Sequence, residues 1–172
     1  HESLLPEILG RATELEVVAA RDRHPLRANH VYVIQPGTQI SLVDHELRVE
    51  RQPTRRSVSE GVDHFFKSLA EVFGERCAGV VLSGTGRDGT NGLRRIKAGG
   101  GITIAQEPAD AGHSAMPRSA SSAARLIRSK GIPRASQISG ISLALASTYA
   151  QPPENCRPGA VPYQQRRASK AV

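Results

Sequence analysis

The 172-residue sequence has no tryptophan, and aromatic residues make up only 3% of it, so aliphatic side chains must fill most of any core. It also has no run of the roughly 18–20 apolar residues that a membrane-spanning helix needs, and no membrane span is expected. The two cysteines, Cys77 and Cys156, lie far apart and outside any metal-ligand spacing. We interpret Cys77 as a buried, reduced thiol, which favours a cytoplasmic location.

Metal-binding clusters are also missing, because no group of His, Cys, Asp and Glu residues has ligand spacing. We therefore expect neither a metal nor a cofactor. Net charge is also absent from the main body of the chain. Residues 1–120 contain 15 basic and 15 acidic residues, whereas residues 121–172 contain 8 basic residues and only Glu154 as an acid. The net charge of +7 therefore belongs to the C-terminal segment, and no nucleic-acid partner is expected.

Two regions follow from this composition. Residues 1–124 are predicted to form an α/β domain, and residues 125–172 a basic, low-complexity, poorly ordered tail. Within the tail, only residues 138–146 are locally apolar.

Hydrophobic spacing predicts alternating helices and strands in the domain. Strand, glycine-rich loop, helix and strand over residues 78–105 indicate a right-handed βαβ unit. The turn Asp44-His45 predicts a hairpin, although it lacks the usual glycine. The expected helices are residues 2–13, 62–73 and 90–98, with short ones at 108–112 and 117–124, and the expected strands are 15–19, 30–34, 39–43, 46–50, 78–82 and 102–105.

The loop at 84–89 has two interpretations. Its sequence, Gly-Thr-Gly-Arg-Asp-Gly, matches the G-x-G-x-x-G pattern of dinucleotide-binding proteins, and Glu107 follows at a suitable spacing. However, Asp88 lies inside the turn whose N–H groups would hold a pyrophosphate, and its carboxylate would repel that ligand. Nucleotide binding is therefore the weaker hypothesis. Alternatively, Asp88 orients a histidine at the carboxyl end of a strand, or it caps the following helix; spacing alone leaves both open.

Several segments in the right order resemble one family. They are Val80–Leu93, Ile96–Gly101, Ile104–Pro108 and Met116–Ala120, preceded by His30–Gly37 and Asp63–Phe66. They are similar to the chemotaxis-type protein-glutamate methylesterases, most of all to the variety fused with a receptor methyltransferase. The resemblance covers about residues 1–120. It implies a doubly wound, mostly parallel, Rossmann-like sheet with a β-hairpin, incomplete at the N-terminus.

The resemblance also implies roles for particular residues. Asp88 matches the aspartate of a Ser-His-Asp triad. Gly84, Thr85 and Gly86 match the loop that lines the pocket and supplies an oxyanion N–H, although the family often has methionine at the position of Thr85. Met116 is expected near the same pocket or in the core. The family's serine and histidine align upstream of residue 1, so this chain is expected to be inactive alone.

The activity implied is hydrolysis of glutamate γ-methyl esters on chemoreceptors, with possible glutamine deamidation. The expected partners are a methylated chemoreceptor and either a missing N-terminal segment or a methyltransferase module. Among residues of this chain, Ser83 lies nearest to Asp88 and His113 is the one histidine in plausible reach. However, none of the serines stands in a nucleophile elbow, and a surface position is the better interpretation of each histidine. A second hypothesis is a non-catalytic interaction module whose basic tail binds acidic partners.

Overall fold

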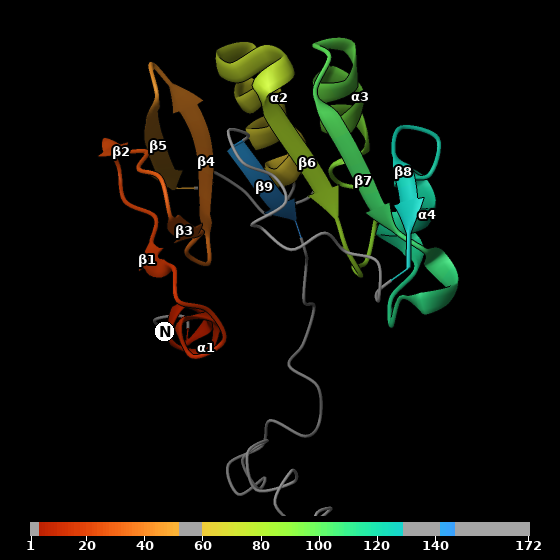
Figure 1. Ribbon diagram of the computed structural model, residues 1–172, viewed down its shortest axis with the longest axis horizontal. Helices are drawn as coiled ribbons and strands as arrows, with labels where there is room; N and C mark the ends of the chain where they lie inside the picture. The colour runs from red at the N-terminus through yellow and green to blue at the C-terminus, as the bar shows by residue number, and fades with distance from the viewer. Residues whose placement is uncertain (1–3, 52–59, 129–141, 147–172) are drawn as a thin grey trace, which may run out of the picture.

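The computed structural model describes residues 4–51, 60–128 and 142–146, the last range as a strand only (Figure 1). The helices are α1 (Leu5–Gly10), α2 (Gly61–Phe73), α3 (Thr90–Ala98) and α4 (Ala115–Ala120), with 3-10 turns η2 (Gly74–Arg76) and η3 (Pro108–Asp110). The strands are β1 (Glu16–Ala19), β2 (His24–Pro25), β3 (His30–Val33), β4 (Thr38–Val43), β5 (Glu46–Arg51), β6 (Cys77–Val81), β7 (Ile102–Gln106), β8 (Arg125–Ile127) and β9 (Ser142–Ala146).

The strands form three hydrogen-bonded groups. A four-stranded parallel sheet has the order β8-β7-β6-β9, and β1 pairs with β3, also in parallel. Antiparallel pairing occurs in the three-stranded group β2-β5-β4, which contains the predicted hairpin. The predicted α/β class, a mostly parallel arrangement with a β-hairpin, is confirmed. The βαβ unit formed by β6, α3 and β7 lies where the sequence places it.

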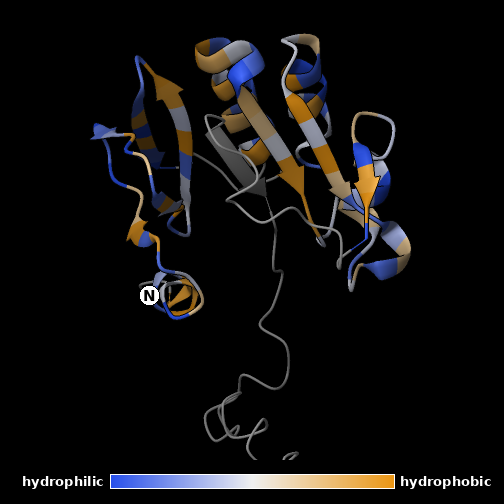
Figure 2. Ribbon diagram, in the orientation of Figure 1, coloured by the Kyte–Doolittle hydropathy of each residue, from blue (hydrophilic) through white to orange (hydrophobic). Residues whose placement is uncertain are grey.

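Strand β6 lies at the centre of the core, since all five of its residues are buried. Helices α2 and α3 pack on each other and cover the same face of β6 (Figure 1). Gly79 makes this close packing possible, because a Cβ there would meet Leu93 and Ile96 of α3 at 2.7 Å and Phe66 of α2 at 3.4 Å. Figure 2 shows apolar residues along most of β6, while α2 and α3 alternate between apolar and polar residues, as amphipathic helices do.

The hairpin turn forms without glycine. Asp44 and His45 both have positive φ angles, 49° and 64°, in the left-handed region that a two-residue hairpin turn requires. Aspartate and histidine are among the residues that tolerate this region best. The hairpin is also fixed to α2, because the Leu42 N–H donates to Ser68 Oγ at 2.9 Å. This contact places β4 beside α2, as Figure 1 shows.

The structure differs from the sequence-based prediction at several short elements. β2 was expected to be loop, and β8 and β9 both lie beyond residue 124, where we placed the tail. The parallel sheet therefore continues past that boundary. β2 and β8 have two and three residues, too few to carry a readable hydrophobic period, so only the backbone of the neighbouring strand defines them. β9 has five residues and falls within the locally apolar residues 138–146. The rest of the predicted tail lies outside the described residues.

Candidate active site

The loop at residues 82–89 leaves the carboxyl end of β6 and enters α3 (Figure 1). Its start is tied to a second segment: the Gly84 N–H donates to the His113 carbonyl at 2.9 Å, and the Met116 N–H donates to the Gly84 carbonyl at 3.1 Å. Further along, Gly86 and Gly89 adopt φ angles of 84° and 89°, which glycine reaches without strain. The loop is thus held at its start and turned sharply at its end.

Asp88 lies between those two glycines and is only 8% exposed. Its carboxylate accepts three backbone hydrogen bonds. Oδ2 accepts from Val62 N at 3.0 Å, and Oδ1 accepts from Asp63 N at 2.9 Å and from Gly89 N at 2.8 Å. Val62 and Asp63 belong to the first turn of α2, so Asp88 caps a helix that is distant in the sequence. The sequence-based alternative of a cap on the following helix α3 is therefore wrong: α3 starts from Gly89, which has no side chain.

Burial raises the pKa of the Asp88 carboxyl above its ordinary value of 3.8, and the nearby charge of Asp63 raises it further. The three backbone N–H groups act in the opposite direction, because they stabilise the carboxylate form. Desolvation is the largest of these influences, so the net shift is upward.

Asp63 is a second buried carboxylate at this place, 7% exposed. Its Oδ1 accepts a hydrogen bond from the Gly92 N–H at 2.6 Å, in the first turn of α3. In the sequence, Asp63 stood out only as part of the segment Asp63–Phe66 that resembles the family, so its role in holding α3 was missed. A signal was present: Asp63 falls beside Val62 and Phe66 on the apolar face of the helix, where a carboxylate needs a partner.

The predicted site residues differ in burial and in contacts. Thr85 and Gly86 are exposed, whereas Gly84 is buried. Met116 is fully buried within the hydrophobic core, and its backbone joins Gly84, so it serves packing and also fixes the loop. His113 has an exposed side chain and contributes its backbone to the loop. Within the described ranges, no histidine ring is hydrogen-bonded to Asp88.

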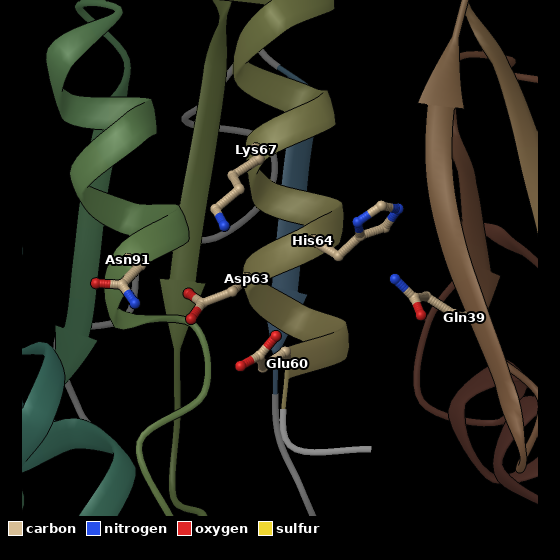
Figure 3. A pocket seen from close by; sticks show the side chains of 6 residues that line it. All are labelled: Gln39, Glu60, Asp63, His64, Lys67 and Asn91. Carbon is tan, nitrogen blue, oxygen red and sulfur yellow. The ribbon is translucent and has the colours of Figure 1, made fainter. Parts of the chain in front are cut away.

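A small open pocket of about 170 Å³ lies beside Asp63 (Figure 3). Its walls come from the first half of α2, the start of α3 and strand β4. Figure 3 shows Asp63 between α2 and α3, and His64 on the opposite side of α2, toward Gln39. The lining residues are Gln39, Glu60, Asp63, His64, Lys67 and Asn91. They are polar and of mixed charge, so the pocket suits a polar group better than an apolar one.

The hydrogen bonds of this region argue against the dinucleotide hypothesis. A pyrophosphate would need the free N–H groups of the loop and of the start of α3. Here the Gly89 N–H donates to Asp88 and the Gly92 N–H donates to Asp63. Two buried carboxylates therefore occupy positions that an anionic ligand would need.

No cluster of three or more His, Cys, Asp or Glu residues able to hold a metal occurs in the described part of the chain. None of the helices described there is long and apolar enough to cross a membrane.

These features define an α/β domain with a buried carboxylate at the carboxyl edge of a parallel sheet, which is where α/β proteins place their sites. The family comparison makes the class specific. Residues 1–137 match the family model described as CheB methylesterase. The chain therefore belongs to the CheB methylesterase family.

Several relatives support this assignment. An uncharacterized 104.1 kDa protein of Rhodobacter capsulatus is 42% identical over 130 residues, which cover 76% of this chain and 14% of that protein. A protein-glutamate methylesterase/protein-glutamine glutaminase of Anaeromyxobacter dehalogenans is 38% identical over 65% of this chain and 33% of its own length. The protein-glutamate methylesterase FrzG of Myxococcus xanthus is 39% identical over 65% of this chain and 34% of its own length. The chain thus spans about a third of these two named methylesterases.

The fold has a solved counterpart. The CheB methylesterase catalytic domain of Thermotoga maritima superposes with a TM-score of 0.62 at 24% identity, covering 72% of this chain and 69% of that one. This likeness supports the fold.

Proposed function

We propose that this chain is the Asp88-bearing part of a protein-glutamate methylesterase, in which Asp88 orients the catalytic histidine. The reaction is hydrolysis of glutamate γ-methyl esters, with glutamine deamidation as a related activity. Two of the relatives carry these activities in their names. The observation that carries the proposal is the buried, backbone-anchored carboxylate of Asp88 at the carboxyl end of β6.

The hydrogen bonds of Asp88 suit an orienting role. Oδ1 accepts two backbone N–H groups, whereas Oδ2 accepts one, from Val62. A carboxylate oxygen has two lone pairs, so Oδ2 keeps one for an imidazole N–H. The backbone bonds fix the direction of that lone pair before the histidine arrives. A carboxylate held in this way selects one tautomer of the histidine and stabilises its protonated form.

In this mechanism a serine hydroxyl attacks the ester carbonyl while the histidine removes its proton and then returns it to methanol as it leaves. Water releases the acyl group in the second half of the reaction. We assign the oxyanion N–H to the Thr85-Gly86 backbone, because the Gly84 N–H already donates to the His113 carbonyl. The serine and histidine are assigned to a further segment of the enzyme, since no histidine ring contacts Asp88 among the residues described. Met116 supports this loop from the core.

The proposed substrate is a methylated chemoreceptor, and the proposed setting is chemotaxis signalling in the cytoplasm. The segment that supplies serine and histidine is either an N-terminal part of the same domain or is presented together with a methyltransferase module.

Methanol release from a methyl-esterified receptor tests the proposal. The purified 172-residue chain is compared with the same chain extended by the serine- and histidine-bearing segment of a family member. We expect turnover from the extended protein and none from the bare chain. In the extended protein, Asp88→Asn should lower kcat by about four orders of magnitude, because the histidine loses its orienting anion.

Asp44→Asn is the matched control, since Asp44 is an exposed aspartate in the hairpin turn. It should leave kcat unchanged. Full activity of the extended Asp88→Asn variant would refute the assignment of Asp88. Turnover by the bare chain would show that the nucleophile lies among its own serines.

A further inference from the structure

The two buried aspartates stabilise each other's helices. Asp88 precedes α3, yet its carboxylate binds the first-turn N–H groups of Val62 and Asp63 in α2. Asp63 lies in α2, yet its carboxylate binds the first-turn N–H of Gly92 in α3. Neither helix has a cap from its own N-cap side chain: Glu60 makes no capping hydrogen bond, and Gly89 has no side chain. The start of α2 therefore depends on a carboxylate just before α3, and the start of α3 depends on a carboxylate in α2.

The close approach of the helices makes this exchange possible. A Cβ at position 92 would overlap the Cβ of Phe66 and would lie 3.2 Å from both Cα and the carbonyl oxygen of Asp63. Glycine at position 92 removes that obstacle, so the N–H of residue 92 reaches Asp63 Oδ1 at 2.6 Å. The result is a closed loop of contacts: Asp88 holds α2, Asp63 of α2 holds α3, and α3 leads directly back to Asp88.

We propose that Asp63 is the positioning residue for Asp88: by binding Gly92 it holds the start of α3, and thereby the loop that carries Asp88, against α2. This inference rests on the proposed function of Asp88. Asp63 does not contact the reacting groups; it acts through the backbone between Asp88 and Gly92. Because both carboxylates are buried, water cannot easily replace either hydrogen bond.

The two aspartates also interact electrostatically. The negative charge of Asp63 favours the protonated form of Asp88 and so raises the pKa of Asp88. Lys67 of α2 lines the pocket beside Asp63, so one cationic side chain lies near the pair. Asparagine at position 63 would keep the acceptor for Gly92 but remove the charge, whereas alanine would remove both. The two substitutions therefore separate the hydrogen bond from the charge.

Amide hydrogen exchange on the 172-residue chain, followed by NMR, tests the hydrogen-bond link without any need for turnover. In Asp63→Ala, protection should fall by about five- to tenfold at Gly92, as for a lost helix cap. It should fall also at the amides that Asp88 binds, those of Val62, residue 63 and Gly89. In Asp63→Asn the protection should stay near that of the unmodified chain.

Glu60→Ala is the matched control, because Glu60 is acidic, adjacent and exposed but makes no capping hydrogen bond. It should leave all four amides protected. If Asp63→Ala affects Gly92 alone, Asp63 is only a cap for α3 and the proposal is wrong. If Asp63→Ala does not fold, the same exchange measurement on Asp63→Leu decides, because leucine fills the apolar face of α2 but offers no acceptor to Gly92. Loss of protection at Val62, residue 63 and Gly89 supports the proposal, and unchanged protection at these amides contradicts it.

Activity supplies the final readout in the extended protein. Asp63→Ala should lower kcat by about 10- to 100-fold with little change in KM, as expected for a displaced catalytic group, and Asp63→Asn should restore most of it. Equal loss in both variants would contradict positioning through the hydrogen bond. Failure of the proposed function is distinguishable: Asp88→Asn would then retain turnover, while the amide exchange result would still report whether Asp63 holds Asp88.

Discussion

The carboxylate of Asp88 accepts a hydrogen bond from the backbone N–H of Asp63, with Oδ1 2.9 Å from the nitrogen. The side chain of Asp63 in turn accepts the Gly92 N–H on the neighbouring helix. This relation joins the beginnings of α2 and α3 at the carboxyl edge of the parallel sheet. The position of Asp88 therefore depends on how α2 and α3 pack, and substitutions between these two helices are expected to affect the site as well.

The raised pKa of Asp88 predicts a specific dependence of stability on pH. A carboxyl whose pKa is higher in the folded than in the unfolded state binds more protons when folded. Its stabilising contribution is therefore present below pH 3.8 and is lost as the pH rises through the folded pKa. Urea unfolding from acid to neutral pH should show the unmodified chain losing stability relative to Asp88→Asn. A gain relative to Asp88→Asn over that range would contradict the direction of the shift.

Gly92→Ala should destabilise the protein, even though alanine is the better helix former by about 1 kcal/mol. The added methyl group would overlap Phe66 and crowd the backbone of Asp63, which forces α2 and α3 apart. We expect a loss of about 1–3 kcal/mol in the free energy of unfolding, measured by urea denaturation. Gly10→Ala is the control, since nothing lies within 4 Å of a Cβ at that position. Equal stability of the Gly92→Ala variant would contradict the close packing.

Thr90→Val should stabilise the protein. Thr90 is 8% exposed, and its Oγ1 is buried without a hydrogen-bond partner in the described structure. Valine has nearly the same shape and lacks the hydroxyl, so the cost of burying an unpaired polar group disappears. The free energy of unfolding should rise by about 1 kcal/mol, visible as a higher Tm. A lower Tm would indicate that the hydroxyl has a partner.

Asp44→Val should weaken the hairpin. A β-branched residue is strongly disfavoured at the φ of 49° that Asp44 adopts. The expected loss is about 1–2 kcal/mol in the free energy of unfolding, measured thermally or with urea. Asp44→Gly should leave stability unchanged or raise it, because glycine adopts this angle freely. Identical effects of valine and glycine would mean that the turn angle does not limit the hairpin.

Much of the fold follows from local patterns. The apolar run that became β6 is buried along its whole length, and α3 spans residues 90–98 as its spacing predicts. The hairpin was also predictable, despite its glycine-free turn, from alternation on both sides of Asp44-His45. These elements are determined by neighbours in the sequence, which is why the sequence reveals them.

The sequence by itself also placed a carboxylate, Asp88, in a glycine-rich loop at the end of a buried strand. It left open whether that carboxylate caps the next helix, and it did not indicate the role of Asp63. Only the tertiary structure decided these points, because Asp63 and Gly92 are 29 positions apart and Asp88 and Asp63 are 25 apart. Hydrophobic periodicity encodes which face of a helix is buried, but not which distant N–H a buried carboxylate meets; that depends on how two helices pack on one sheet.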